Sequence, residues 1–133
     1  MDAINPVAGN VETKKKILLV DDDTLQLTQT KENLRDIYDV IAVRSGAAAI
    51  KFLSRNLVDI ILLDYMMPEM DGPATYANIK ENPEASNIPI VFLTGASEQG
   101  TFHDTINELK PQGIITKPAT KSDIVAIITE VLG

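Results

Sequence analysis

The sequence contains no cysteine and no tryptophan, and only 5% of its 133 residues are aromatic. Without cysteine, the chain can form no disulfide, no cysteine-ligated zinc site and no thiol nucleophile. This lack is compatible with a reducing compartment, and we predict a cytoplasmic protein. Because aromatic side chains are so few, the core must consist mainly of isoleucine, leucine and valine.

Long apolar runs and positive charge are scarce as well. No stretch approaches the ~20 apolar residues of a membrane-spanning helix, and no apolar run of signal-peptide length follows the N-terminal lysines. The net charge is −7, with 19 acidic and 12 basic residues. Since nucleic-acid binding depends largely on Lys and Arg, we expect neither direct nucleic-acid binding nor membrane association. An acidic chain suits the binding of cations and of other proteins.

The length of 133 residues fits one domain, which can bury enough surface to fold without a metal or a crosslink. Residues 1–13 are polar and contain Pro and Gly, and we expect a flexible leader there. Residues 14–133 are then the folded domain. We find no internal repeat and no linker between domains.

Four short apolar runs predict buried strands, at residues 17–20, 60–63, 90–93 and 114–115. None alternates polar with apolar residues, and such runs are typical of a parallel sheet that is covered on both faces. A weaker fifth strand is predicted at residues 39–43.

Helical patterns separate these runs, and we interpret their apolar stripes as core packing. A further helix is expected at residues 73–80, because it opens with Pro and stops before Asn82-Pro83. Alternating strands and helices predict an α/β fold, with right-handed crossovers that place helices on both faces. The stripes consist of Leu27, Leu34 and Ile37; Ala49, Ile50 and Leu53; Phe102, Ile106 and Leu109; and Ile124, Ile127, Ile128 and Val131.

Reactive side chains stand where the predicted strands end. The first strand runs into Asp21-Asp22-Asp23, and the later ones into Asp64, Thr94 and Lys117. Because the carboxyl ends of parallel strands share one edge of a sheet, we expect these side chains to lie together. Taken singly, each has a structural explanation, such as Asp23 capping a helix or Asp64 forming a turn. Their joint placement favours a site.

The chemistry of this set points to phosphoryl transfer. Clustered carboxylates need a counter-charge, and their oxygens are suited to Mg²⁺. A carboxylate can act as a nucleophile and form an acyl phosphate. Lys117 and Thr94 can bind the phosphoryl oxygens and stabilise developing charge.

These residues resemble the receiver domains of bacterial two-component response regulators. The matching stretches are residues 17–22 (ILLVDD), 59–72 (DIILLDYMMPEMDG), 88–96 (IPIVFLTGA) and 113–118 (GIITKP). The resemblance covers about residues 15–132. It implies a flavodoxin-like (βα)5 three-layer sandwich, with a five-stranded parallel sheet of order 2-1-3-4-5.

The resemblance also implies roles for single residues. Asp64 would be the phosphoacceptor and a metal ligand, Asp22 would ligate Mg²⁺ directly, and Asp21 would act mainly through metal-bound water. The backbone carbonyl of Met66 would be a further ligand. Thr94 would contact the phosphoryl group.

Further along the chain, Lys117 would pair with Asp64 and then with the phosphoryl oxygens. The bond before Pro118 would be cis, as is plausible only for X–Pro bonds. Pro68 and Gly72 would shape the loop after the third strand.

By the same resemblance, the chain would be a signalling switch and not an enzyme in its own right. It would promote its own phosphorylation and dephosphorylation, taking the phosphoryl group from a sensor histidine kinase or a histidine phosphotransfer protein. The modified domain would bind an output partner through the face near the fourth helix, fifth strand and fifth helix. We expect a monomer or a weak homodimer.

Three positions depart from the family pattern or use it unusually. Ile114 stands where the family usually has the Tyr or Phe that reports phosphorylation. Met66 and Ala96 occupy positions that tune the lifetime of the acyl phosphate, and both are apolar. Since neither can orient an attacking water, we hypothesise slow self-dephosphorylation.

Two alternatives belong to other classes. Asp21-Asp22-Asp23-Thr24 superficially resembles the Asp-x-Asp-x-Thr loop of haloacid dehalogenase-type phosphohydrolases, but the threonine comes one residue early and Asp64 would have no role. A degenerate receiver that signals without phosphorylation is disfavoured by the complete acidic set, although Ile114 favours it mildly. The single histidine, His103, is expected to be an exposed helix residue.

Overall fold

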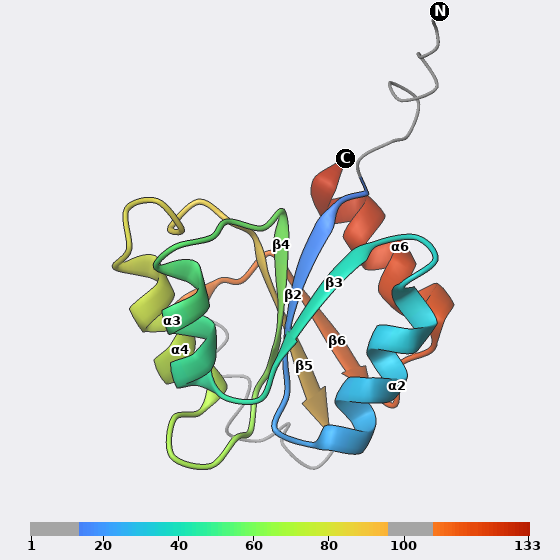
Figure 1. The fold of residues 1–133 in the computed structure, drawn as a ribbon, viewed down its shortest axis with the longest axis horizontal. Coiled ribbons are helices and arrows are strands. Elements are labelled where there is room, and N and C mark those ends of the chain that lie inside the picture. Colours follow the sequence, from blue (N-terminus) through green and yellow to red (C-terminus); the bar gives the residue numbers. More distant parts are fainter. Residues whose placement is uncertain (1–13, 96–107) are drawn as a thin grey trace, which may run out of the picture.

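The computed structural model describes residues 14–95 and 108–133, which form one α/β unit (Figure 1). The predicted leader lies outside these ranges. So do Ala96, Phe102, His103 and Ile106, and the predictions made for them stay predictions.

A five-stranded parallel sheet forms the centre of the molecule, in the order β3-β2-β4-β5-β6. Counted from the first strand in the chain, this is the order 2-1-3-4-5, so the expected topology is confirmed. The strands are β2 (Lys16–Val20), β3 (Asp39–Val43), β4 (Ile60–Asp64), β5 (Ile90–Gly95) and β6 (Gly113–Lys117).

Two helices cover each face of this sheet in the described residues (Figure 1). Neighbouring residues of a strand point to opposite faces. Leu18 and Leu63 therefore pack towards one pair of helices, while Leu19 and Leu62 pack towards the other pair. The first pair is α3 (Gly46–Leu53) and α4 (Gly72–Lys80), and the second is α2 (Thr24–Leu34) and α6 (Lys121–Leu132).

Side-chain caps set where the helices begin. The carboxylate of Asp23 accepts hydrogen bonds from the backbone N–H groups of Leu25 and Gln26, as expected for an N-cap of α2. Asp71 caps α4 in the same way, and α6 opens with a reciprocal capping box between Thr120 and Asp123. The caps of α2 and α6 come within a few residues of Asp21 and Lys117, so they fix the backbone where the reactive side chains stand.

Two predictions about elements are wrong. Ile37 was placed on the apolar face of a helix, but α2 ends at Leu34 and the Ile37 side chain is 40% exposed. The last strand was expected to be buried on both faces, whereas Ile114 is 37% exposed and only Ile115 is buried. The reason is that β6 lies at the edge of the sheet, with β5 as its only neighbour in the described sheet. None of the helices described here is long and apolar enough to cross a membrane.

Candidate functional site

Three carboxylates meet at the carboxyl ends of β2 and β4. One oxygen each of Asp21, Asp22 and Asp64 lies within 4.8 Å of the others. The parallel pairing of Val20 with Leu63 places Asp21 level with Asp64, which ends β4. Asp21 and Asp64 are 3% and 4% exposed, while Asp22 is more accessible to solvent. The predicted acidic group therefore exists, with one open side.

The ammonium of Lys117 joins this group from the end of β6. Its Nζ atom lies 2.9 Å from Oδ1 of Asp64 and 3.6 Å from Oδ2 of Asp21. The following peptide bond, to Pro118, is cis, as the resemblance implied. The contact with Asp64 was expected, whereas the contact with Asp21 was not. A single ammonium thus serves two buried carboxylates.

The charge of the group shifts the pKa values of its members. Burial raises the pKa of Asp64 to about 7; the hydrogen bond from Lys117 opposes this rise, and the charge of Asp21 adds to it. Burial lowers the pKa of Lys117, but its hydrogen bond and charge interaction with Asp64, together with Asp21, outweigh burial and raise it overall. Both upward shifts have one cause in common, because negative charge exceeds positive charge at this edge of the sheet.

Two more predicted residues lie at the same edge, and within the described ranges neither makes a hydrogen bond or an ion pair with the carboxylates. Thr94 is 1% exposed and follows Leu93, the register partner of Asp64 on β5. Its hydroxyl makes no hydrogen bond to any residue that the structure describes. Met66 is 58% exposed in the loop after β4, and its carbonyl likewise accepts no hydrogen bond within the described ranges. Buried polar groups are normally paired, and the Thr94 hydroxyl is an exception among the described residues. It therefore has a free hydrogen bond to offer a ligand.

The loop after β4 is held tightly against the site. The N–H of Gly72 donates to the carbonyl of Tyr65 at 2.8 Å. A Cβ atom at Gly72 would lie 2.6 Å from the carbonyl oxygen of Asp64 and 2.8 Å from Cα of Tyr65. Earlier in the loop, the Pro68 carbonyl accepts from the N–H of Met70 at 2.7 Å. Glycine is needed here because no side chain fits, which agrees with the loop-shaping role predicted for Gly72.

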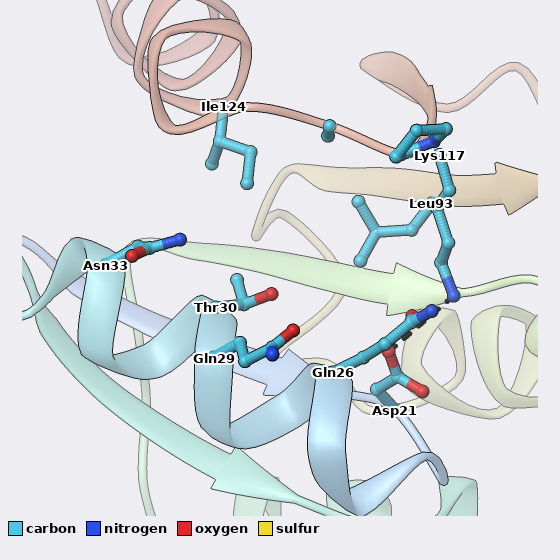
Figure 2. Close-up of a pocket in the computed structure, with 10 residues that line it drawn as sticks. Asp21, Gln26, Gln29, Thr30, Asn33, Leu93, Lys117 and Ile124 are labelled. Carbon is cyan, nitrogen blue, oxygen red and sulfur yellow. Dashed lines mark ion pairs between the residues drawn. The ribbon is translucent and has the colours of Figure 1, made fainter.

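A cavity of about 170 Å³ opens beside Asp21 and Lys117, between α2 and α6 (Figure 2). Strand β5 and the loop before α6 line the cavity with largely apolar groups, and α2 contributes four neutral polar side chains. Those four make no side-chain hydrogen bond to any described residue, so their polar groups are free to contact a partner. They are Gln26, Gln29, Thr30 and Asn33, and the other lining residues include Leu93, Pro118, Ala119 and Ile124.

The four polar residues that α2 contributes to this cavity were not predicted from the sequence. Residues 26, 29, 30 and 33 recur at i, i+3, i+4 and i+7, which is the spacing of one helix face. A polar stripe at this spacing identifies a helix face as well as an apolar stripe does, so the spacing of these four residues was the signal for the polar lining of the cavity.

A family model for the response regulator receiver domain matches residues 17–129. The chain belongs to this family. The matched range contains the three carboxylates, Thr94 and Lys117, so the site described above lies within the receiver domain.

Known proteins agree with this assignment. The receiver is 41% identical over 81 residues to a probable cyclic di-GMP phosphodiesterase of Vibrio cholerae, which covers 61% of this chain and 18% of that protein. It is 32% identical over 124 residues to the two-component response regulator ORR3 of Oryza sativa, covering 91% and 93% of the two chains. The chain therefore spans less than a fifth of the first relative and nearly all of the second.

A solved structure with the same fold is the receiver domain of a sensor histidine kinase from Pseudomonas aeruginosa. The two share 26% identity and a TM-score of 0.82, over 90% of this chain and 98% of that one. That structure has a magnesium ion coordinated in its active site cleft.

Proposed function

We propose that Asp64 of this receiver accepts a phosphoryl group in a Mg²⁺-dependent reaction, and that the modified domain changes its affinity for a partner. The observation that carries the proposal is the contact of Lys117 with both Asp64 and Asp21. The ammonium lies closer to Asp64 than to Asp21, at 2.9 Å against 3.6 Å, and from this position it can bind the oxygens of a phosphoryl group on Asp64.

The residues present fit a magnesium ion. Asp21, Asp22, Asp64 and the carbonyl of Met66 offer hard oxygen ligands, and Asp22 lies on the open side. Burial, and after it the charge of Asp21, raises the pKa of Asp64 to about 7, and a divalent cation at the site would favour the ionised carboxylate. When bound, the ion would neutralise charge on the carboxylates and on the transferring group.

The transfer would proceed by attack of a carboxylate oxygen of Asp64 on the phosphorus of a phosphohistidine. The new O–P bond forms as the N–P bond breaks, and the imidazole leaves with its electron pair and takes up a proton. Lys117 would move from Asp64 to a phosphoryl oxygen, and Thr94 would donate its hydroxyl to another. Both would stabilise charge that develops during transfer.

The donor would be a sensor histidine kinase or a histidine phosphotransfer protein. We infer that it approaches over the cavity between α2 and α6, because this opening reaches both Asp21 and Lys117 and presents unpaired amides. An output domain or protein would then bind the altered receiver. A cytoplasmic location, a monomeric or weakly dimeric state and the lack of direct nucleic-acid binding stay predictions, as does the division into leader and domain.

The domain would promote its own phosphorylation from a small donor and its own dephosphorylation, without turnover of other substrates. We propose that its acyl phosphate decays slowly. Met66 is apolar and 58% exposed beside the acidic group, where it cannot orient a water molecule. The second apolar position, Ala96, lies outside the described residues. Fast decay of the phosphorylated protein in a Mg²⁺ buffer would contradict the proposal.

Incubation with Mg²⁺ and acetyl phosphate, followed by intact mass measurement, tests the main proposal. We expect the wild type to gain one phosphoryl group and Asp64→Ala to gain none. Asp36→Ala, which removes an exposed carboxylate paired with Lys121, should behave as the wild type. No gain in the wild type, or an equal gain in Asp64→Ala, would refute Asp64 as the acceptor.

A further inference from the structure

The receiver has an aliphatic residue where its family usually carries an aromatic reporter, but it has an aromatic group elsewhere. Tyr65, which directly follows Asp64, meets the ring of Phe92 edge-on, with 5.7 Å between ring centroids and an interplanar angle of 73°. Phe92 in turn stacks on Tyr76 of α4 at 5.7 Å and 22°. All three side chains are buried. A continuous aromatic group therefore leads from the phosphoacceptor into α4.

The aromatic group is closely packed where it meets Gly72. The space beside Gly72 is closed by the carbonyl of Asp64, the Cα atom of Tyr65 and Cε1 of Phe92, which would lie 2.6, 2.8 and 3.0 Å from an added Cβ. Close-packed interiors have few voids and transmit strain. We therefore expect a movement of the Asp64–Tyr65 backbone to shift the ring of Phe92, and with it the ring of Tyr76.

The aromatic group ends in a hydrogen bond to a distant part of the chain. The hydroxyl of Tyr76 donates to the carbonyl oxygen of Leu109 at 2.8 Å, across 33 residues of sequence. Burial raises the pKa of Tyr76, so the hydroxyl stays protonated and remains a donor. This is the only hydrogen bond of the Tyr76 hydroxyl among the described residues, so it is the one polar contact through which this ring meets the Leu109 carbonyl.

Leu109 lies shortly before β6, which begins at Gly113. The next residue, Lys110, has a φ of 53°, a left-handed conformation that a lysine adopts only at a cost in energy. Gln112 then pairs with Ile90 through both its backbone N–H and its side-chain carbonyl, at 3.1 and 3.0 Å. Strand β6 begins at Gly113 and ends at Lys117, which holds Asp64. The segment of residues 109–113 thus connects with the phosphoacceptor by two routes: along β6, and through the aromatic group.

We propose that the Tyr76–Leu109 hydrogen bond reports phosphorylation of Asp64 to the segment of residues 109–113, in place of an aromatic side chain at position 114. Tyr76 is a positioning residue in this scheme. Phosphorylation draws Lys117 away from Asp64, the carboxyl end of β4 shifts, and the aromatic group moves the Tyr76 hydroxyl relative to Leu109. The strained Lys110 gives the segment a second conformation to adopt when that bond changes. The proposal rests on Asp64 being the phosphoacceptor.

Hydrogen exchange of the amides of residues 109, 110 and 112–115 tests it, measured on the full chain with Mg²⁺, with and without acetyl phosphate; residue 111 is proline and has no amide hydrogen. The intact mass is recorded in parallel. In the wild type we expect exchange to change by about fivefold or more, the lower range of ordinary coupling between sites. Tyr76→Phe keeps the ring contacts and loses only the hydroxyl, so it should take up phosphoryl to the same extent with less than about a twofold change in exchange.

Two matched variants sharpen the experiment. Tyr38→Phe removes the hydroxyl of a buried tyrosine in the opposite core, which has no hydrogen-bond partner in the described chain, and should retain the wild-type change. Ile114→Ala should retain it too. If Tyr76→Phe does not fold, Phe92→Leu interrupts the ring contacts and leaves the hydroxyl bond, and it should also abolish the change.

Each outcome decides the matter. A phosphorylated wild type with unchanged exchange, or a Tyr76→Phe protein with the full change, would overturn this inference alone. Loss of the change in Ile114→Ala but not in Tyr76→Phe would assign the readout to position 114 and overturn it as well. No mass gain in the wild type would overturn the proposed function, and this inference would then fall with it.

Discussion

Asp64 occupies an environment that opposes its own ionisation. It is buried, it shares the ammonium of Lys117 with Asp21, and its pKa is raised to about 7 from 3.8. A folded state that binds a proton more tightly than the unfolded chain loses stability as the pH rises through that interval. The penalty is absent below about pH 4 and complete above about pH 7. The acceptor is thus a source of instability in the metal-free protein.

Asp64→Asn should therefore stabilise the metal-free protein at alkaline pH. The amide keeps the shape of the side chain and carries no charge, while Lys117 retains Asp21. We expect a gain on the order of 2 kcal/mol at pH 8.5 that shrinks towards zero near pH 4. Urea unfolding in a chelating buffer at several pH values measures it. Equal unfolding free energies of the wild type and Asp64→Asn at pH 8.5 would show that the charge of Asp64 does not destabilise the fold.

Met66 permits a second prediction about a single side chain. Met66→Asn places a polar amide beside the acidic group, where it can orient an attacking water. We expect the acyl phosphate to decay on the order of tenfold faster, below the 10²–10⁴ contributed by a full general base. Loss of phosphorylated mass after removal of acetyl phosphate gives the rate. Met67→Leu, at the next and buried position, is the control and should leave the decay unchanged.

Among the elements, the junction of β4 with α4 depends on the absence of a side chain. A Cβ at Gly72 would meet the backbone of Asp64 and Tyr65, which cannot yield, whereas a Cβ at Gly113 would meet Cδ1 of Ile127 at 2.8 Å, which can rotate away. We expect Gly72→Ala to lose about 2–3 kcal/mol of unfolding free energy and Gly113→Ala about 1 kcal/mol or less. Urea denaturation compares them. A smaller loss in Gly72→Ala than in Gly113→Ala would contradict the packing described here.

The polar stripe of α2 should matter for one class of donor only. Gln29→Ala removes one amide that lines the cavity between α2 and α6 and adds no charge near Asp21, which lines the same cavity. We expect phosphoryl uptake from a phosphohistidine protein that loads the wild type to fall about tenfold, as for one important interface residue. Uptake from acetyl phosphate should be unchanged. Thr28→Ala, on an exposed position of α2 outside the cavity, should preserve both rates. An equal loss in that variant would refute the proposed approach of the donor.

Across the whole molecule, the sequence predicted the strands, which depend on local residue patterns. It did not predict where a helix ends or how far a strand is exposed, which depend on contacts with other elements. β-Branched runs located β2, β4 and β5, since burial on both faces leaves continuous apolar residues. The strand order came from the family resemblance, because periodicity carries no information on which strands pair. Ile37 matched the helical spacing but lies beyond a helix that stops at Leu34, and Ile114 is exposed because β6 lies at an edge.

The candidate site shows the same division. The position of Asp21, Asp22, Asp64, Thr94 and Lys117 at strand ends predicted that they lie together, whereas the pairing of Lys117 with Asp64 was implied by the family resemblance. The contact of Lys117 with Asp21 and the bond from Tyr76 to Leu109 join residues 96 and 33 positions apart, by the numbering of the chain. Such contacts depend on how the strands and helices are set against each other in three dimensions, which no local pattern contains.

Magnesium should stabilise the entire fold, because an ion that binds only the native site shifts the unfolding equilibrium. At a tenfold excess over its dissociation constant the gain is about 1.4 kcal/mol, or roughly 5 °C in melting temperature for a domain of this size. Thermal unfolding with and without Mg²⁺ measures it. Asp22→Asn should abolish most of the shift and Asp36→Asn should preserve it; a shift that survives in Asp22→Asn would place the ion elsewhere.

The shared ammonium of Lys117 has a kinetic consequence. Three carboxylates against one ammonium leave the fully ionised cluster with two negative charges, and a phosphodonor is itself an anion. Like charges repel most strongly where water is excluded. Encounters between donor and receiver should then be unproductive until a divalent cation has arrived. The cation would then bind before the donor, and the response of the receiver would depend on the concentration of free cation as well as on that of the donor.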